Sequence, residues 1–171
     1  MRESATDRML RVDQAGEYGA TRIYAGQLAV MGDRAPLAGE IRHMAEQEAE
    51  HNAKFDALMA ARGVRPTALQ PLWNVAGFAL GAATALIGPK AAMACTAAVE
   101  EEIDRHYSAQ LDELDDRDPE LSDMIAAFRE DERDHRALAL ANGAEQAPAY
   151  PLLSGAIRLG CRVAIRLAER V

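Results

Sequence analysis

Aromatic residues are scarce in this sequence, and no run of alternating β-branched residues indicates a strand. Aromatic side chains make up 5% of the 171 residues, whereas hydrophobic residues make up 49%. Ala, Leu, Glu and Arg dominate instead, and all four are compatible with helices. A chain of this length can bury a sizeable core and is typical of one domain. We therefore expect an all-α fold in which residues 1–171 form a single domain.

Cysteine is also scarce, since Cys95 and Cys161 are the only two. Two cysteines cannot build a disulfide framework or a four-thiolate metal site. Their small and apolar neighbours predict buried or half-buried free thiols. The first ten residues, MRESATDRML, lack the apolar core of a signal peptide, and no Arg- and Ser-rich transit segment precedes the domain. We therefore expect cytoplasmic residence.

Basic residues are outnumbered along most of the chain. There are 19 Lys and Arg against 27 Asp and Glu, which gives a formal net charge of −8. This balance argues against a nucleic-acid partner, because phosphate binding requires a basic surface. The balance reverses near the C-terminus, where one acid, Glu169, stands among Arg158, Arg162, Arg166 and Arg170.

Pro and Gly divide the sequence into helical segments. The expected helices cover Thr6–Met31, Pro36–Arg62, Leu72–Ile87, Ala91–Leu114, Pro119–Asn142 and Leu152–Glu169. Two pairs of long segments flank the apolar third segment, which indicates an internal duplication. This order predicts a four-helix bundle with an extra apolar connecting helix and a C-terminal amphipathic helix.

Two of the long segments carry a Glu-x-x-His motif in the middle of an apolar stripe. Glu48 and His51 form one motif, and Glu132 and His135 form the other. The stripes comprise Ile41, Met44, Phe55 and Leu58 in the second segment, and Leu121, Ile125, Phe128 and Ala139 in the fifth. Stripes with this alternation of three and four residues face the core of a helical bundle.

The other two long segments each place an acid on a plausible inward stripe. Glu17 does so in the first segment, 31 residues before Glu48. In the fourth segment, Glu100 lies 32 residues before Glu132. Glu100 shares its stripe with Met93, Thr96, Ile103 and Tyr107. Two further acids follow directly, so spacing alone leaves open which residue of Glu100–Glu102 points inward.

A buried group of four ionised Glu is costly unless cations accompany it. No Lys or Arg lies on these stripes, whereas two divalent metal ions would balance the four charges. Carboxylate-rich ligation favours iron or manganese over zinc or copper, and this ligand pattern is the ferritin-like di-iron arrangement. The alternative, ordinary surface acids, is disfavoured because both motifs have partners at matched distances. The predicted ligands are Glu17, Glu48, His51, Glu100, Glu132 and His135.

Neighbouring residues carry weaker signals. Gln47 and Asp131 directly precede motif Glu residues and are candidates to orient the ligand histidines. For Asp131 a plain surface acid is an equal alternative. His106 and Tyr107 follow Glu100 by one to two helical turns. For Tyr107, core packing and a role in redox or proton transfer both stay open.

Two segments have possible roles at a membrane. Leu72–Ile87 is nearly uncharged but too short to span a bilayer comfortably, so it is either a buried connecting helix or an interfacial segment. Leu152–Glu169 combines a basic stripe with apolar residues, which suits an anionic membrane surface. An ordinary packed helix with solvated arginines is the alternative. A buried metal centre beside a lipid-binding surface suggests a hydrophobic substrate that arrives from the membrane.

Six stretches carry a family resemblance: RVDQAGEYGATRIYAGQ, HMAEQEAEHNAKF, RPTALQPLWNVAGFALGAATALIG, AMACTAAVEEEIDRHY, FREDERDH and APAYPLLSGAIRLGCRVAIRLAERV. They resemble the 3-demethoxyubiquinol 3-hydroxylase family of ubiquinone biosynthesis over essentially the whole chain. The resemblance implies a ferritin-like peripheral membrane protein with two irons. Such a protein hydroxylates the ring of demethoxyubiquinol with O2.

The resemblance also implies roles for individual residues. One iron would be held by Glu17, Glu48 and His51, and the other by Glu100, Glu132 and His135, with Glu48 and Glu132 bridging. The family pattern thus selects Glu100 from the three consecutive acids. The pair His106 and Tyr107 would pass electrons and protons to the centre.

Further expectations concern partners and location. The substrate would be a polyprenyl quinol, NADH the source of electrons, and a lipid-binding accessory protein of the pathway a partner. No Gly-rich dinucleotide fingerprint is present, so the nicotinamide would meet the quinone directly or act through another protein. The missing leader suggests a bacterial protein on the cytoplasmic face of the inner membrane. A peroxide or oxygen scavenger, an iron store, and a non-catalytic quinone- or lipid-binding protein are the competing functions.

Overall fold

The computed structural model describes residues 4–170, except for the side chain of Asp116. In this part of the chain all regular structure is helical, which confirms the all-α expectation. The helices are α1 (Ala5–Met31), α2 (Ala38–Arg62), α3 (Gln70–Ile87), α4 (Pro89–Leu114), α5 (Pro119–Ala141) and α6 (Tyr150–Ala168). Single 3-10 turns, η1 (Asp115–Arg117) and η2 (Ala144–Gln146), precede α5 and α6.

Local sequence signals account for the helix ends. Ser4 caps α1 through a capping box, in which its hydroxyl accepts from the backbone N–H of Asp7 at 3.0 Å. Gly63 ends α2 in a left-handed conformation that glycine adopts without strain. Asp118 caps α5, and Pro119 occupies its first turn, where a missing N–H costs nothing.

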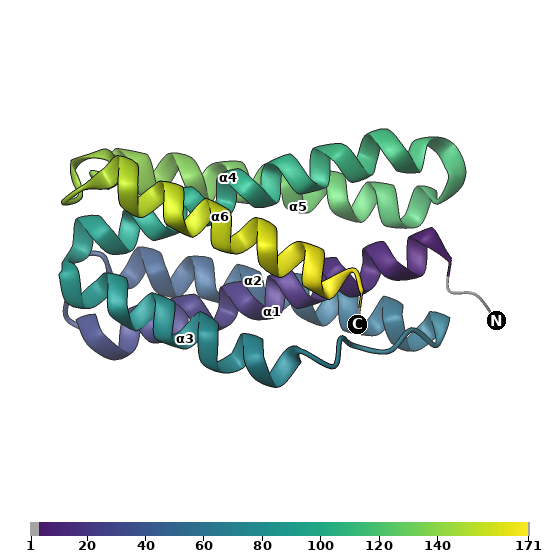
Figure 1. The fold of residues 1–171 in the computed structure, drawn as a ribbon, viewed down its shortest axis with the longest axis horizontal. Coiled ribbons are helices and arrows are strands. Elements are labelled where there is room, and N and C mark those ends of the chain that lie inside the picture. The colour runs from purple at the N-terminus through teal and green to yellow at the C-terminus, as the bar shows by residue number, and fades with distance from the viewer. Residues whose placement is uncertain (1–3, 171) are drawn as a thin grey trace.

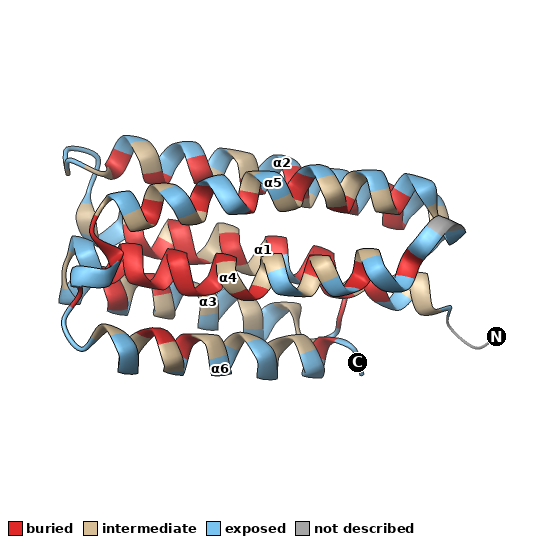
Figure 2. Cartoon of the chain, turned by 90° about the horizontal axis from the view of Figure 1, so that it is seen from above, coloured by how far each residue is buried: buried red, intermediate tan, exposed pale blue. Residues whose placement is uncertain are grey.

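Consecutive helices run in alternate directions along the long axis of the molecule (Figure 1). The helices α1, α2, α4 and α5 form the bundle, while α3 packs on α1 and α6 packs on α4. Figure 2 shows α4 between α5 and α6, with buried residues along its length. The duplication expected from the sequence therefore extends to the third helix of each half.

The contact between α3 and α1 depends on glycine. A Cβ atom added to Gly81 would lie 1.9 Å from the carbonyl oxygen of Ile23. A Cβ atom on Gly26 would lie 2.2 Å from the carbonyl oxygen of Phe78. The two backbones are therefore in direct contact, which only glycine permits.

The outward side of α3 is exposed, so α3 is not the buried connecting helix that was one of the two interpretations. Only Gly81, Thr84 and Ala85 of this helix are buried. Val75 keeps 69% and Leu86 keeps 75% of its surface exposed. Among residues 4–170, we find no helix with both the length and the apolar character needed to cross a membrane.

Candidate metal centre

The six side chains predicted as ligands meet in the middle of the bundle. They form two groups whose ligand atoms lie within 4.8 Å of one another: Glu17, Glu48, His51 and Glu132 in the first, and Glu48, Glu100, Glu132 and His135 in the second. All six are buried, with at most 3% of their surface exposed. Each of the four bundle helices contributes at least one of them. The placement is thus as the sequence indicated, while the role as ligands stays a prediction.

The histidine atoms that face this cluster have carboxylates close by. Nδ1 of His51 lies 3.4 Å from Glu17 Oε2 and 3.4 Å from Glu132 Oε1. Nδ1 of His135 lies 3.1 Å from Glu48 Oε1 and 3.3 Å from Glu132 Oε2. Neither nitrogen has a hydrogen-bond partner despite these distances. These atoms are thus close together without being hydrogen-bonded to one another.

The carboxylate oxygens of the cluster also lack hydrogen-bond partners. The buried oxygens without a partner are Glu17 Oε2, both oxygens of Glu48, Glu100 Oε2 and both oxygens of Glu132. Buried polar atoms are normally hydrogen-bonded, and a cluster of exceptions needs an explanation. Six oxygens and two imidazole nitrogens are donors that metal ions accept. The donor set therefore fits two metal ions, one for each group.

The unsatisfied oxygens also separate two kinds of carboxylate. Glu48 and Glu132 have both oxygens free, and each belongs to both groups. Glu17 and Glu100 belong to one group each, and each has one oxygen held by a tyrosine. The first pair could therefore contribute oxygens to both groups, whereas each acid of the second pair has one oxygen left for a single group.

Electrostatics in the cluster favour added positive charge. Burial and the nearby charge of Glu132 hold the pKa values of Glu48 and Glu100 well above their usual range. Although burial raises the pKa of Glu132, the neighbouring His135 and His51 lower it to about 2. Burial lowers the pKa of His51, but Glu132 and Glu17 raise it to about 10. Without cations the cluster therefore retains protons that metal ions would displace.

Each histidine is oriented by a residue of the opposite helix. The Nε2 atom of His51 lies 3.0 Å from Asp131 Oδ2, and that of His135 lies 3.1 Å from Gln47 Oε1. These bonds cross between α2 and α5 and turn Nδ1 of each ring toward the cluster. They confirm that Gln47 and Asp131 are placed to orient the histidines.

The His106–Tyr107 pair lies on the α1 side of α4. The Tyr107 hydroxyl is buried and donates a hydrogen bond to Glu17 Oε1. His106 is only partly buried, and its Nε2 lies 3.0 Å from Asp13 Oδ1. The same oxygen accepts a hydrogen bond from Gln110 at 2.8 Å.

Asp13 was missed by sequence reasoning. It is 2% exposed, and burial raises its pKa despite the opposing effect of His106. Its position four residues before Glu17 places it on the same helical face, which was the available signal.

The structure separates the three consecutive acids. Glu100 is 1% exposed and lies in the cluster. Glu101 faces α6, where Arg158 donates to it at 2.9 Å. Glu102 is also buried, but its partner is Arg105 at 3.0 Å. Only the first acid is available to the centre, as the family pattern implied.

Fold and site together define a ferritin-like helical bundle whose carboxylates and histidines could hold metal ions. Residues 4–168 match the model of the family described as ubiquinone biosynthesis protein COQ7. The chain belongs to this family and is a hydroxylase of ubiquinone biosynthesis.

Three relatives illustrate the similarity. A 3-demethoxyubiquinol 3-hydroxylase of Rhodospirillum rubrum is 60% identical over 165 residues, which cover 96% of this chain and 78% of that protein. The mitochondrial NADPH-dependent 3-demethoxyubiquinone 3-hydroxylase of Homo sapiens is 54% identical over 98% of this chain and 78% of its own. The mitochondrial 5-demethoxyubiquinone hydroxylase of Saccharomyces cerevisiae is 42% identical over 96% of this chain and 78% of its own.

Proposed function

We propose that the chain is a di-iron monooxygenase that hydroxylates the ring of a polyprenyl demethoxyubiquinol with O2 at a membrane surface. The observation that carries this proposal is the set of buried Glu and His atoms that face one another without hydrogen-bond partners. The names of the relatives supply the substrate class. We further propose that residues 1–171 act as one domain.

The reaction replaces a ring C–H bond by C–OH and reduces the second oxygen atom of O2 to water. It consumes two electrons and two protons besides O2. Two bound iron ions would supply the redox chemistry for reducing O2. Carboxylate-rich ligation favours iron or manganese over zinc and copper, which agrees with an oxygenase.

The residues of the chain hold this chemistry in place. Glu48 and Glu132 would bridge the ions, with Glu17 and His51 on one and Glu100 and His135 on the other. The surrounding bundle excludes water, because all six side chains are buried. A dry, fixed cage keeps the ligands in one geometry throughout turnover.

Protons would reach the centre from the His106 side. His106 keeps 17% of its side-chain surface exposed and pairs with the buried Asp13. The adjacent Tyr107 donates to Glu17, which belongs to the first group of ligands. These contacts support a role for His106 and Tyr107 in moving protons and electrons between solvent and the centre.

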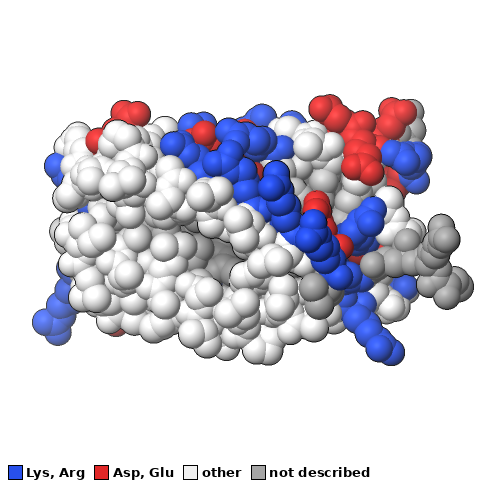
Figure 3. Space-filling model, viewed as in Figure 1, with Lys and Arg blue, Asp and Glu red and all other residues white. Residues whose placement is uncertain are grey.

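The substrate would arrive from the side covered by α3 and α6. Tyr24 and Glu100 line a narrow crevice between α1 and α4 on this side, which is too tight to hold a water molecule. Figure 3 shows a hollow between these two helices. The large exposed apolar residues on them are Leu72, Val75, Phe78, Leu86 and Ile87 of α3 and Leu152, Leu159, Val163 and Leu167 of α6. An apolar surface of this extent supports contact with lipid.

The basic stripe Arg158, Arg162, Arg166 and Arg170 runs along α6 and past its end. These arginines form the blue band across the apolar side in Figure 3. Arg158 and Arg162 are directed at Glu101 and Glu102, at 2.9 and 3.8 Å, so their charge is partly balanced within the protein. Arg166 and Arg170 remain exposed. We therefore propose that apolar residues of α3 and α6 provide most of the membrane affinity.

Electron donor, partner and location are part of the proposal. A reduced nicotinamide, NADH in our prediction, would deliver the electrons, and the relative from Homo sapiens is named NADPH-dependent. The proposed location is the cytoplasmic face of a bacterial inner membrane, with a lipid-binding accessory protein of the pathway as partner.

The test is single-turnover hydroxylation with labelled oxygen. The protein is reconstituted anaerobically with ferrous iron, given a short-chain demethoxyubiquinol, and exposed to 18O2. Mass spectrometry should find one 18O atom in the ring of the product, and none with Glu132→Ala. Oxygen or peroxide consumption without an organic product would favour a scavenger. Turnover that survives the loss of iron in the variant would contradict the proposal.

A further inference from the structure

The duplicated halves of the protein place a second tyrosine in a position equivalent to that of Tyr107. Tyr107 follows Glu100 by seven residues on α4, and Tyr24 follows Glu17 by seven residues on α1. Each tyrosine donates a hydrogen bond to the acid of the other half. Tyr107 donates to Glu17 Oε1, and Tyr24 donates to Glu100 Oε1 at 2.6 Å. The centre therefore has one tyrosine for each carboxylate that belongs to a single group.

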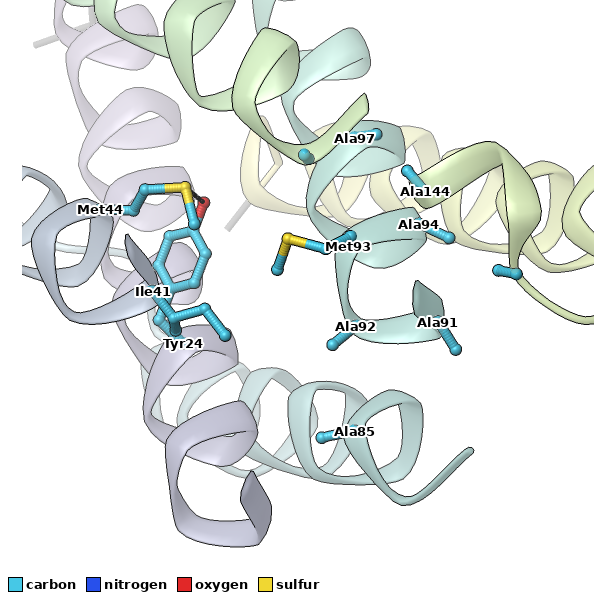
Figure 4. Close-up of a cluster of buried hydrophobic side chains, with 12 residues drawn as sticks. Tyr24, Ile41, Met44, Ala85, Ala91, Ala92, Met93, Ala94, Ala97 and Ala144 are labelled. Carbon is cyan, nitrogen blue, oxygen red and sulfur yellow. Dashed lines mark hydrogen bonds between the residues drawn. The ribbon is translucent and has the colours of Figure 1, made fainter. Parts of the chain in front are cut away.

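The surroundings of the two tyrosines differ. Tyr107 lies near the charge of Asp13, in the polar region of His106. Tyr24 is 1% exposed and lies at the edge of an alanine-rich apolar cluster, where its hydroxyl is 3.7 Å from the sulfur of Met44 (Figure 4). Its side chain also lines the narrow crevice between α1 and α4, together with Ala20, Ile23, Thr96, Val99 and Glu100.

This apolar setting makes Tyr24 important for Glu100. Oε1 of Glu100 accepts the tyrosine hydroxyl, whereas Oε2 has no partner and faces the cluster. The cluster around Tyr24 and Met44 is buried and apolar, and the crevice beside Tyr24 and Glu100 has no room for a water molecule. If the hydroxyl were removed, Oε1 would be buried without a donor, and the carboxylate would be free to turn.

We propose that Tyr24 is a positioning residue that restricts Glu100 to one ligand oxygen and thereby sets the affinity of the second group for its metal ion. The inference rests on the proposed metal centre. It divides the centre into two unequal positions. The first lies beside the polar path of His106 and Asp13, and the second lies beside the buried apolar cluster that contains Tyr24.

The test is a titration of the metal-free protein with Co(II), whose visible spectrum reports on coordination. Tyr24→Phe keeps the ring and removes the hydroxyl. We expect this variant to lower the affinity for one of two Co(II) ions about ten- to a hundred-fold and to change the visible spectrum of that ion. The other ion should bind as in the wild type. Tyr18→Phe is the matched control, because Tyr18 lies on α1 and its hydroxyl makes no hydrogen bond among residues 4–170.

Repeating the titration in a Glu17→Ala variant identifies which of the two ions is affected. Glu17→Ala removes a ligand that only the first group uses, so the remaining high-affinity ion reports on the second group. In the Glu17→Ala background, Tyr24→Phe should still lower the affinity for the remaining ion at least ten-fold. Tyr107→Phe should leave this affinity unchanged, because Glu17, the acceptor of its hydroxyl, is gone. The reverse pattern, or equal effects of the two variants, would overturn the inference.

The outcomes separate this inference from the proposed function. A wild-type protein that binds no Co(II) would contradict the metal centre itself. A wild type that binds two ions, together with a Tyr24→Phe variant that binds both equally well, would contradict only the role of Tyr24. Far-UV circular dichroism of each variant shows whether the helices are intact.

Discussion

At the scale of single residues, the centre depends on hydrogen bonds that reach across the bundle. Asp131 is partly exposed, yet its carboxylate holds the imidazole of a histidine that is 3% exposed. The bond fixes which ring nitrogen faces the cluster. Outer partners of this kind raise the basicity of a ligand histidine and limit its rotation.

We predict that Asp131→Ala lowers metal affinity about ten- to a hundred-fold, because His51 loses the partner that orients it. Competition with a chelator of known affinity measures the change. Asp134→Ala is the control, since Asp134 is an exposed acid on the same helix and should leave the affinity unchanged. Equal affinities for both variants would show that the bond to Asp131 has no influence on the centre.

Helical spacing could predict five of the six clustered side chains, because it puts Glu17, Glu48, His51, Glu132 and His135 on inward stripes. Spacing alone could not decide which of the consecutive acids Glu100–Glu102 faces the cluster, and the family pattern selected Glu100. In the structure the three acids point in different directions and each has its own partner. The bond between Tyr24 and Glu100 joins residues 76 positions apart, and that between Asp13 and His106 joins residues 93 apart. Such contacts depend on how α1 is registered against α4, which spacing within one helix does not determine.

At the scale of elements, the close approach of α3 to α1 sets the shape of the apolar side. The sequence predicted the helix at Leu72–Ile87 but left open whether it is buried. That question was decided by backbone contact at Gly26 and Gly81, which leaves the outer side chains of α3 exposed. Larger residues there would hold the helices further apart.

Gly81→Ala should destabilise the protein by about 1–3 kcal/mol, because the new methyl group would clash with the carbonyl of Ile23. The free energy of unfolding from urea titration measures this effect. Gly16→Ala is the matched control on α1, where a Cβ atom meets nothing within 4 Å. It should be neutral or stabilising by up to about 1 kcal/mol. A stable Gly81→Ala variant would mean that the two helices can separate at no cost.

A helix cap combined with an ion pair joins α2 to the start of α5. Asp118 accepts from the backbone N–H of Leu121 at 3.2 Å, and Arg62 donates to both of its carboxylate oxygens. The guanidinium of Arg62 lowers the pKa of Asp118 below its ordinary value of 3.8. The charge of Asp118 therefore stabilises the fold fully at pH values above 3.8, and this stabilisation is lost as the pH falls through the lowered pKa of Asp118.

Asp118→Ala should lower the free energy of unfolding at pH 7 by about 1 kcal/mol, as for other lost helix caps. The difference from the wild type should narrow once the pH falls below about 3.8, because the native carboxyl then becomes protonated. Urea titrations at several pH values measure both effects, with the exposed Asp123→Ala as the control. A difference that stays constant down to the lowest pH would contradict the role of the Asp118 charge.

At the scale of the whole molecule, the large exposed apolar side chains among residues 4–170 are concentrated on α3 and α6, apart from Val30 on α1. The large exposed apolar residues of α3 and α6 lie on one side, and α5 lies on the other side of α4 from α6 (Figure 2). Glu100 lies beside a narrow crevice between α1 and α4, and α3 and α6 pack on these two helices. Under the proposed function, a membrane bound at this side would bring a lipid-soluble substrate near the group of side chains that contains Glu100.

We expect the double variant Val75→Glu and Leu86→Glu to lose at least ten-fold in binding to liposomes, because both side chains would enter the apolar phase. Co-sedimentation with neutral and anionic vesicles measures the loss. Ala137→Glu adds a charge at an exposed position of α5 and should bind like the wild type. If the double variant bound normally, another surface would face the lipid.

The most direct test of the metal centre is anomalous diffraction at the iron absorption edge from crystals of the iron-loaded protein. We predict two peaks, one among Glu17, Glu48, His51 and Glu132 and the other among Glu48, Glu100, Glu132 and His135. A single peak, no peak, or iron bound outside these six side chains would contradict the account.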